Sequence, residues 1–222
     1  MLKIVVFDSG YGGEVFADCL KEAFPLAEII RVIDWRNAEE FVKSRTRARR
    51  AAKEALRPYF GRVDLIILAN YYLSITSLKY FERSYQNQKF LGLKLPQPDT
   101  FIKRPITILT TKSLSRTANY HNYLFRLKRK TNTICLDHWL PLIDDGELTE
   151  QMILEEFENF YQKHRYKPTE LTLACSHFND IVPILREKID KNLKIHDGFE
   201  EAIRNVGKIL KIRGGTVKKR KK

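Results

Sequence analysis

The stretch IVVFDSGYGG at Ile4–Gly13 runs from four apolar residues into a glycine-rich turn, and the helical pattern EVFADCLKEA follows at Glu14–Ala23. An apolar run without polar alternation is typical of a strand that is covered on both faces. A strand, a tight turn and a helix in this order begin a parallel βαβ unit. The opening of the chain therefore predicts an α/β fold.

The same alternation continues along the chain. Short runs rich in Val, Ile and Leu predict further strands at Ile29–Ile33, Leu65–Leu68, Ile106–Leu109, Thr133–Leu136, Leu171–Cys175 and Leu193–Asp197. Longer amphipathic patterns predict further helices at Ala38–Tyr59, Ser113–Lys128, Thr149–His164, Ile181–Ile189 and Phe199–Leu210. Helices between buried strands predict largely parallel sheets with helices on both faces.

A polar break that contains prolines, Ser84–Arg104, separates two halves of similar layout. In each half a strand leads through a short turn into a helix, and a later strand ends in a small polar cluster. This repeat predicts two pseudo-symmetric three-layer domains with an active-site cleft between them, where the carboxyl ends of the strands meet. We expect residues 1–95 and 200–217 to form the first domain, residues 96–199 the second, and residues 218–222 a basic tail.

Positive charge dominates the composition: 40 lysine and arginine residues against 27 aspartate and glutamate residues give a net charge of +13. The last five residues, Lys218–Lys222, are all basic and form either a solvated tail or an arm that binds nucleic acid. The remaining charge centres on Ser44–Arg57 and suits an anionic partner, including a small acidic substrate.

Several classes of protein are excluded. No stretch approaches the roughly 20 apolar residues of a membrane-spanning helix, and the N-terminus lacks the pattern of a signal peptide. We therefore expect no membrane association and a cytoplasmic location. Cys19, Cys135 and Cys175 include no CxxC pair, which argues against both a disulfide framework and a zinc site. The sequence predicts no metal and no cofactor.

Four polar clusters directly follow predicted strands: Asp8-Ser9-Gly10, Asn70-Tyr71, Thr110-Thr111 and Cys175-Ser176-His177. The glycines of the DSGYGG turn would leave backbone N–H groups free to approach an anion. The turn matches neither of the common nucleotide-binding patterns. It is therefore either an anion site or a plain connection between a strand and a helix.

Cys175 stands between a predicted buried strand and a predicted helix, two residues before His177. A helix N-terminus and a neighbouring imidazolium both favour the thiolate form of a cysteine. A thiolate can act as a nucleophile or as a base toward a carbon acid; the alternative is an inert buried cysteine. Asp144, in PLIDDG (Pro141–Gly146), either caps a helix or polarises His177.

Six segments, in order, resemble motifs of the aspartate/glutamate racemase superfamily, most closely those of glutamate racemase. VFDSGYGG (Val6–Gly13) resembles the opening FDSGxGG motif, ILAN (Ile67–Asn70) falls where the family carries ACNT, and LACSHF (Leu173–Phe178) resembles GCTHY. TTKSLSRTANY (Thr110–Tyr120) is similar to the family pattern GTxxTxxSxxY, and CLDHWLPLIDDG (Cys135–Gly146) is similar to a segment that ends in PLVExG. IHDGFEEAIRNV (Ile195–Val206) is similar to a late segment in which DSG precedes a helix. The resemblance covers nearly the whole chain.

The resemblance implies an isomerase without a cofactor, in which two cysteines flank the Cα of an acidic amino acid and exchange its proton. By position, Cys175 would be one catalytic thiol, with His177 and Asp144 as its supporting partners. Asp8 and Ser9 would support the opposite side and bind the substrate. The remaining residues implied to contact the substrate are Asn70, Tyr71, Thr111 and Ser176. The resemblance also implies that the chain can form a homodimer.

Three positions depart from the family pattern. Ala69 is assigned to the position of the first catalytic cysteine, Tyr71 replaces the following threonine, and Asp34–Ser44 replaces the usual substrate loop. Racemisation by paired thiols is therefore excluded in its usual form.

We expect an altered racemase-like enzyme that transfers a proton through Cys175 at the Cα of a small acidic substrate of the glutamate or aspartate type. Three alternatives stay open. Tyr71, Tyr72 or Asp8 could replace the missing thiol; the protein could be a one-base lyase or decarboxylase of the same superfamily; or it could be a non-catalytic binding protein whose tail engages nucleic acid or another anion.

Overall fold

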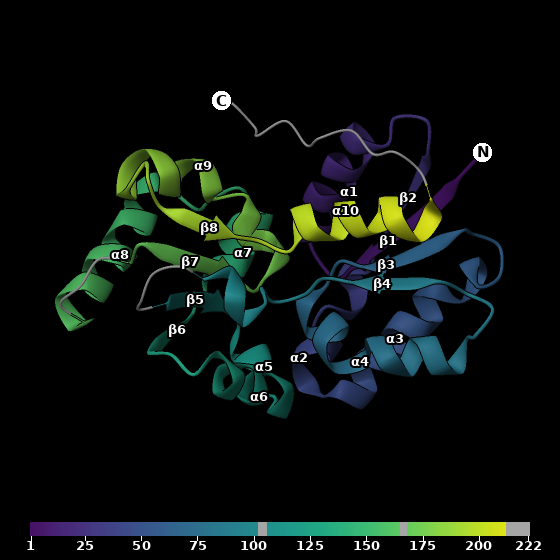
Figure 1. Ribbon diagram of the computed structural model, residues 1–222, viewed down its shortest axis with the longest axis horizontal. Coiled ribbons are helices and arrows are strands. Elements are labelled where there is room, and N and C mark those ends of the chain that lie inside the picture. Colours follow the sequence, from purple (N-terminus) through teal and green to yellow (C-terminus); the bar gives the residue numbers. More distant parts are fainter. Residues whose placement is uncertain (102–105, 165–167, 212–222) are drawn as a thin grey trace.

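The computed structural model describes residues 1–101, 106–164 and 168–211. Two four-stranded, fully parallel sheets form its framework (Figure 1). The first has the order β2-β1-β3-β4, with β1 at Lys3–Asp8, β2 at Glu28–Ile33, β3 at Leu65–Leu68 and β4 at Phe90–Gly92. The second has the order β6-β5-β7-β8, with β5 at Ile106–Thr110, β6 at Thr131–Cys135, β7 at Glu170–Leu173 and β8 at Lys194–His196.

Helices cover both faces of each sheet, as the α/β prediction requires. In Figure 1, α1 (Gly12–Ala23) and α10 (Phe199–Leu210) lie on one side of the first sheet, and α3 (Arg45–Leu56) and α4 (Tyr71–Ser84) on the other. The further α-helices are α2 (Glu40–Lys43), α5 (Lys112–Ser115), α6 (Ala118–Leu127), α7 (Trp139–Asp144), α8 (Glu150–His164) and α9 (Val182–Ile184). The 3-10 helices are η1 (Trp35–Asn37), η2 (Arg57–Tyr59), η3 (Pro98–Thr100) and η4 (Ser176–Asn179), and η5 (Leu185–Ile189) is a π-helix.

The central strands are buried because their residues are apolar on both faces. All four residues of β3 and all five of β5 are buried, and so are the last five of β1. One apolar cluster spans both halves of the molecule: it contains Ile4 and Phe16 of the first half and Ile108 and Ala174 of the second. The two halves are therefore packed against each other through a shared core.

Three predicted elements are corrected by the structure. The helix expected at Ala38–Tyr59 is interrupted at Ser44, whose extended backbone ends α2 and whose side chain accepts a hydrogen bond from the N–H of Arg47 to begin α3. The helix expected at Ser113–Lys128 is divided into α5 and α6, and Thr117 caps the second part. The break at Ser84–Arg104 contains the edge strand β4 rather than irregular chain alone.

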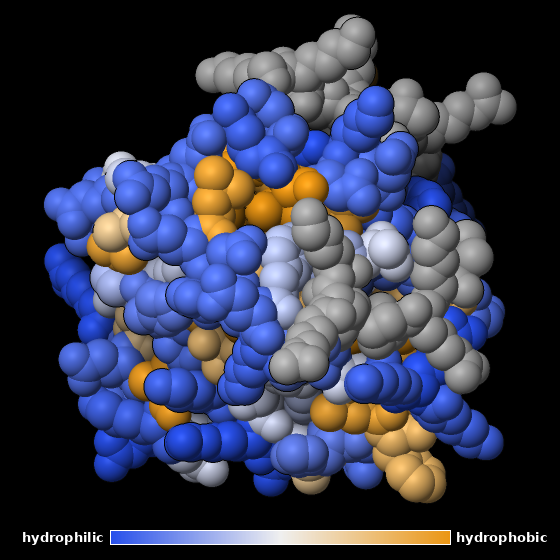
Figure 2. Space-filling view, turned by 90° about the vertical axis from the view of Figure 1, so that its left-hand side faces the viewer, coloured by the Kyte–Doolittle hydropathy of each residue, from blue (hydrophilic) through white to orange (hydrophobic). Residues whose placement is uncertain are grey.

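The helices α4 and α7 were not predicted. Asn70 begins α4 by accepting a hydrogen bond from the N–H of Leu73 at 2.9 Å. The domain boundaries stay a prediction, and the basic tail, 218–222, lies outside the described residues. Among the residues described, no helix combines the length and the apolar character needed to span a membrane. Figure 2 shows that the face formed by the second half is largely hydrophilic, with small separate apolar patches.

Candidate active site

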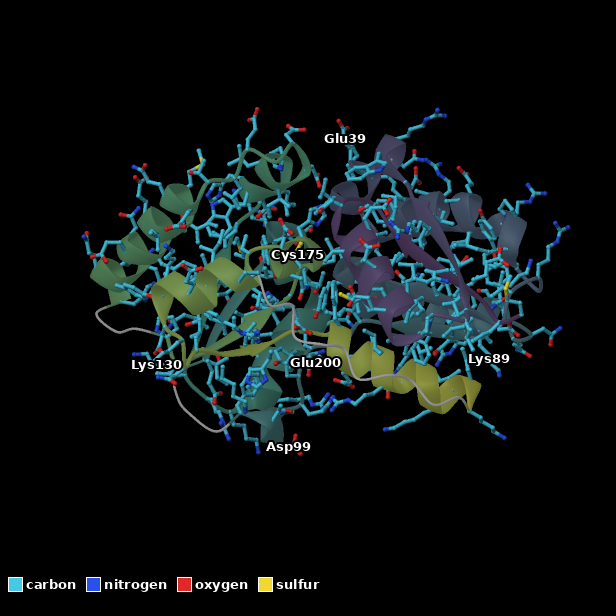
Figure 3. All side chains as sticks on the ribbon, turned by 90° about the horizontal axis from the view of Figure 1, so that it is seen from above. Glu39, Lys89, Asp99, Lys130, Cys175 and Glu200 are labelled. Carbon is cyan, nitrogen blue, oxygen red and sulfur yellow. The ribbon has the colours of Figure 1, made fainter. Side chains whose placement is uncertain are left out.

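A cavity of about 440 Å³ lies where the carboxyl ends of both sheets meet. Cys175 lies near the junction of the two halves, as Figure 3 shows. Two groups of residues line the cavity. The polar side chains, together with Cys175, are Ser9, Glu39, Asn70, Tyr71, Tyr72, Thr111, Ser113, Asp144, Ser176 and His177; the apolar residues are Ala38, Phe41, Val42, Leu140, Pro141 and Ala174.

A chain of three side chains connects the thiol to a carboxylate. The Sγ of Cys175 lies 3.7 Å from Nδ1 of His177, and Nε2 of His177 lies 3.0 Å from Oδ1 of Asp144. Cys175 and His177 are 8% and 7% exposed, so both groups are largely shielded from water. Oδ1 of Asp144 also accepts a hydrogen bond from the N–H of Tyr11 at 3.3 Å, which ties α7 to the first half. This supports the interpretation that Asp144 polarises His177.

His177 is held in its protonated form. Burial lowers the pKa of the imidazole, but hydrogen bonds to Asp144 and Cys175 and the charge of Asp8 outweigh it and raise the pKa from 6.5 to about 11. An imidazolium has two N–H donors, and here they face a carboxylate and a sulfur atom. The N–H at Nδ1 of this imidazolium is thus directed at the sulfur atom of Cys175.

Asp8, which was predicted to be catalytic, does not line the cavity. Its carboxylate is fully buried and accepts three hydrogen bonds: from the N–H of Ser9 at 2.7 Å, from Nδ2 of Asn70 at 3.0 Å and from Oγ of Ser176 at 2.8 Å. Burial raises the pKa of Asp8, and the charge of His177 and the three hydrogen bonds counteract part of that rise. The structure thus gives Asp8 a positioning role: it joins the backbone of Ser9, which follows β1, to the side chains of Asn70 and Ser176, which follow β3 and β7.

The two halves have the same strand register at the site. In the first half, Phe7 of β1 pairs with Leu68, the last residue of β3, and the N–H of Ala69 donates to the carbonyl oxygen of Phe7 at 2.7 Å. In the second half, Leu109 of β5 pairs with Leu173, the last residue of β7, and the N–H of Ala174 donates to the carbonyl oxygen of Leu109 at 2.8 Å.

This register corrects the position of the missing thiol. Because Ala69 is equivalent to Ala174, the residue equivalent to Cys175 is Asn70. Asn70 and Cys175 are both N-cap residues of the following helix and both line the cavity, whereas Ala69 is fully buried and does not line it. The first assignment was wrong because the match was anchored on the asparagine of ACNT rather than on its alanine.

Both polar atoms of the Asn70 side chain are hydrogen-bonded within the protein. Its Nδ2 donates to Oδ1 of Asp8 and to Oγ of Ser9, both at 3.0 Å, and its Oδ1 accepts from the N–H of Leu73. Ser176 likewise donates its hydroxyl proton to Asp8. The donors of Asn70 and Ser176, which were expected to contact the substrate, are therefore engaged within the protein.

Ser9 and Thr111 remain as side-chain donors at the cavity. The Ser9 hydroxyl accepts from Asn70, which leaves its own proton free for a ligand. The Thr111 hydroxyl accepts from the N–H of Leu114 at 3.4 Å and lies 3.0 Å from the hydroxyl of Ser113. Ser113 and Tyr72 were not predicted as substrate-binding residues, although Tyr72 could have been found from the repeat, because the register makes it equivalent to His177.

Tyr71 does not protrude into the cavity as a free phenol. The residue is 3% exposed, its ring belongs to the shared core, and its hydroxyl lies against Gly198. Burial and the charge of Asp197 raise the pKa of Tyr71 well above 10. Burial also raises the pKa of Tyr72, against the charges of Arg45 and Arg49. Neither phenol is therefore suited to act as a base at neutral pH.

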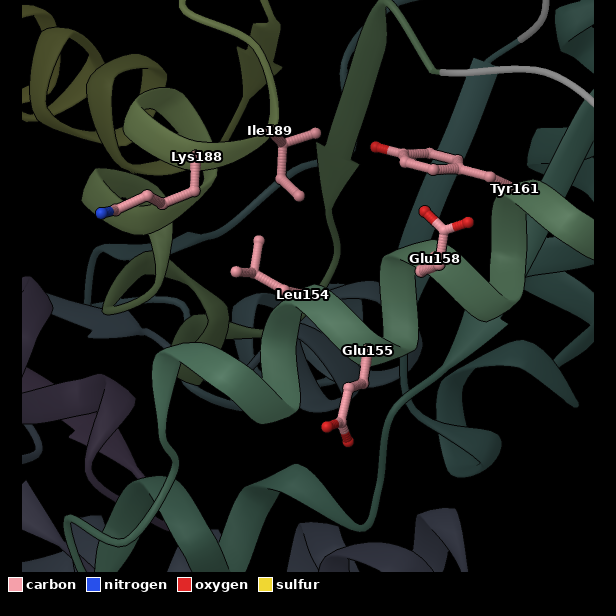
Figure 4. A pocket seen from close by; sticks show the side chains of 6 residues that line it. All are labelled: Leu154, Glu155, Glu158, Tyr161, Lys188 and Ile189. Atoms are coloured by element: carbon pink, nitrogen blue, oxygen red, sulfur yellow. The ribbon is translucent and has the colours of Figure 1, made fainter.

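A second hollow, of about 340 Å³, lies between α8 and η5 (Figure 4). It is lined by Leu154, Glu155, Glu158, Tyr161, Lys188 and Ile189, and it shares no lining residue with the first cavity. Its lysine is paired with Glu150 and Glu187. The thiol, the imidazolium and the pseudo-symmetric strand ends all belong to the first cavity.

Known proteins share this sequence pattern and this fold. No protein-family model matches the chain. The glutamate racemase of Aquifex aeolicus is 23% identical over 198 residues, which cover 87% of this chain and 76% of that protein. The glutamate racemase of Campylobacter jejuni is 27% identical over 211 residues, 89% of this chain and 82% of that protein. The chain is thus similar in sequence to glutamate racemases over most of its length.

Solved structures of a glutamate racemase and of an aspartate racemase share the fold. The crystal structure of Escherichia coli glutamate racemase, a complex with L-glutamate and an activator, superposes with a TM-score of 0.82 at 16% identity, over 99% of this chain and 86% of that one. The aspartate racemase of Picrophilus torridus superposes with a TM-score of 0.63 at 16% identity, over 96% of this chain and 95% of that one. The expected arrangement of two α/β halves is thereby confirmed.

Proposed function

We propose that the protein is an enzyme of the Asp/Glu racemase type in which a single thiol, Cys175, transfers a proton at the Cα of a small carboxylic acid. The observation that supports this most directly is the Cys175–His177–Asp144 chain at the wall of the cavity. Acidic amino acids of the glutamate and aspartate type are the first substrates to test, because the relatives are named for them.

The proposed step begins with the thiolate of Cys175 removing the proton from Cα. The electron pair of the C–H bond moves into the adjacent carboxylate, which becomes an enediolate, and Cys175 becomes a thiol. The hydroxyls of Ser9 and Thr111 are placed to donate hydrogen bonds to the carboxylate oxygens as negative charge accumulates there. The thiol then returns a proton to Cα, and the thiolate is restored.

The opposite face of the substrate would meet Asn70. An amide neither accepts a proton from carbon nor donates one at neutral pH, and both polar atoms of this side chain are already hydrogen-bonded. We therefore propose proton exchange with retention of configuration. The same arrangement would suit a lyase or decarboxylase that protonates a carbanion from one side, which is the second candidate function.

The test is hydrogen–deuterium exchange at Cα, followed by NMR in D2O with both enantiomers of glutamate, aspartate and leucine, with optical rotation measured in parallel. We expect exchange without inversion. Cys175→Ala should lower the rate by about 100-fold or more, the scale of a lost acid/base group. Cys135→Ala, at a half-buried thiol that does not line the cavity, is the matched control.

The variant Asn70→Cys tests whether Asn70 lies at the face of the substrate opposite Cys175. Placing a thiol opposite Cys175 should produce exchange with inversion, and Ala69→Cys should not, because Ala69 is buried beside the cavity rather than at it. Inversion by the unmodified protein would contradict the one-thiol mechanism. Exchange that survives Cys175→Ala would show that another group is the base, and no exchange with any amino acid or malonate would favour the non-catalytic alternative.

A further inference from the structure

We propose that the rim of the cavity selects a carboxylic acid with an apolar side chain over one with a second carboxylate. This inference rests on the proposed function, since it assumes that Cα lies next to Cys175 and that the α-carboxylate lies at the strand ends. With these two groups placed there, the side chain of the substrate must point toward the rim.

The floor and the rim of the cavity come from different elements. The floor is polar and consists of residues that follow strands, such as Ser9, Thr111 and Cys175. We define the rim as the lining residues that come from helices or from the segment around α2: Ala38, Glu39, Phe41, Val42, Tyr72 of α4, Ser113 of α5, and Leu140, Pro141 and Asp144 of α7. Apart from Glu39, Ser113 and Asp144, the rim is built from apolar and aromatic side chains.

Apolar surface at the rim is left uncovered by the residues that the structure describes. Val42 is 58% exposed although it lines the cavity, and Leu140 is half-buried. Phe41 packs on Phe7 with its ring centroid 5.9 Å away, so the segment is anchored from below. An aliphatic or aromatic substrate side chain would cover this surface and remove it from water, which is favourable in proportion to the apolar area buried.

Apart from the imidazolium of His177, which is already paired with Asp144, the described residues that line the cavity offer no counter-charge to a second carboxylate. No lysine or arginine is among the described residues that line the cavity, whereas Glu39 presents a carboxylate. Lys43, which directly follows Val42, donates to Glu39 at 3.0 Å and to Glu40 at 3.1 Å. An unpaired carboxylate moved from water to such a rim loses hydration without a compensating partner.

The arginines that follow this segment, Arg45 and Arg49, do not line the cavity. Arg49 donates to Oγ of Ser77 and to the carbonyl of Thr76, both at 3.0 Å, and its guanidinium lies 4.6 Å from the ring centroid of Tyr80. Arg45 is exposed and does not line the cavity. Neither Arg45 nor Arg49 therefore lines the cavity, although the charges of both act on Tyr72.

The experiment has two readouts on the full-length protein: Cα exchange in D2O, and protection of Cys175 from alkylation by iodoacetamide, measured on its peptide by mass spectrometry. The probes are the enantiomers of leucine, phenylalanine and glutamate. We expect leucine or phenylalanine to exceed glutamate in exchange rate by about tenfold or more, and to protect Cys175 at lower concentration.

A variant at Val42 tests the rim directly. Val42→Arg places a cation there and should shift the glutamate-to-leucine ratio toward glutamate by about tenfold, while the apolar control Val42→Met should leave that ratio within about twofold. Because Val42 is largely exposed, both variants should fold. An unchanged ratio in Val42→Arg would overturn the assignment of the rim.

The outcomes separate the two proposals. Faster exchange or stronger protection by glutamate would overturn the apolar preference and leave the one-thiol reaction intact. Protection by leucine or phenylalanine without any exchange would support the preference and contradict the reaction. Absence of protection by all three amino acids at millimolar concentration would overturn the preference as well.

Discussion

Asn70 and Cys175 occupy equivalent positions in the two halves and differ in what their side chains can do. A thiol loses its proton near neutral pH when a positive charge is close, and an amide does not. Asn70 instead serves the fold, because it caps α4 and holds Asp8 and Ser9. One half of the duplicated site thus carries groups suited to proton transfer, and the other carries a fixed scaffold.

His177 gives a prediction about stability and pH. Its folded-state pKa of about 11 lies above the ordinary value of 6.5. Its protonation therefore stabilises the fold fully below pH 6.5, and this contribution is lost as the pH rises toward 11. We expect the stability advantage over His177→Gln to be about 2 kcal/mol at pH 6 and to shrink steadily by pH 10.

Urea denaturation across this pH range is the measurement for His177. The control is His121→Gln, at an exposed position of α6. A difference between the protein and His177→Gln that stays constant with pH would show that the imidazole is neutral in the fold.

The cluster of Cys175, His177 and Asp144 could be predicted from the sequence because its members are chemically distinctive. Cys175, His177 and Asp144 stood out as a thiol, an imidazole and a carboxylate at strand ends, and the structure brings them together. The equivalence of Asn70 and Cys175 could not be predicted from the sequence motifs alone, because it depends on the register between neighbouring strands. The rim could not be predicted either, since it joins residues that are distant in sequence.

At the scale of elements, strands were predicted better than the short helices. Runs such as Leu65–Leu68 are apolar throughout and follow a polar residue, here Asp64, so burial determines their conformation. The helix α4 was missed because its sequence, YYLSITSLKYFERS, is rich in aromatic and β-branched residues, whose helix propensity is low. The edge strand β4 has only three residues and follows a polar stretch.

The close approach of Tyr71, the first residue of α4, to Gly198, the N-cap residue of α10, yields a prediction about stability. A Cβ at this position would overlap the hydroxyl of Tyr71 and lie 3.2 Å from the carbonyl oxygen of Lys94. Gly198→Ala should therefore destabilise the fold by about 1–3 kcal/mol, the usual cost of overpacking. Removing the hydroxyl in Tyr71→Phe should relieve part of this loss when the two changes are combined.

Urea unfolding of the two single variants and the double variant gives the coupling between Tyr71 and Gly198. Arg204→Ala, on the exposed side of α10, serves as the control for effects of substitution in that helix. Strictly additive losses would show that the two side chains do not meet.

At the scale of the whole molecule, polar contacts complete the junction of the two halves at the site. The hydroxyl of Ser176 reaches Asp8 at 2.8 Å, and the N–H of Tyr11 reaches Asp144 at 3.3 Å. The internal repeat predicted two halves but gave no sign of the core that they share, because its residues are alike in kind to those of any buried strand. The geometry around Cys175 therefore depends on how closely the halves approach.

A substitution at Gly12 tests whether the geometry around Cys175 depends on the close approach of the two halves. A Cβ there would overlap the side chain of Ser176 and lie 2.6 Å from the backbone nitrogen of His177. We expect Gly12→Ala to lower stability by about 1–3 kcal/mol and to reduce Cα exchange more than 10-fold, because His177 must move away from its partners. Exchange rates and urea unfolding are measured together, with Glu22→Ala on the exposed face of α1 as the control. Full activity in Gly12→Ala would contradict a tight junction.

The pairing of Asn70 with Cys175 has a consequence for handedness. Racemases must treat mirror-image substrates alike, which demands two chemically matched walls. A pocket with one reactive wall and one inert wall distinguishes left from right. If a prochiral precursor, such as a disubstituted malonate, lost carbon dioxide there, every product molecule would receive its hydrogen from the same direction and the enzyme would release a single enantiomer.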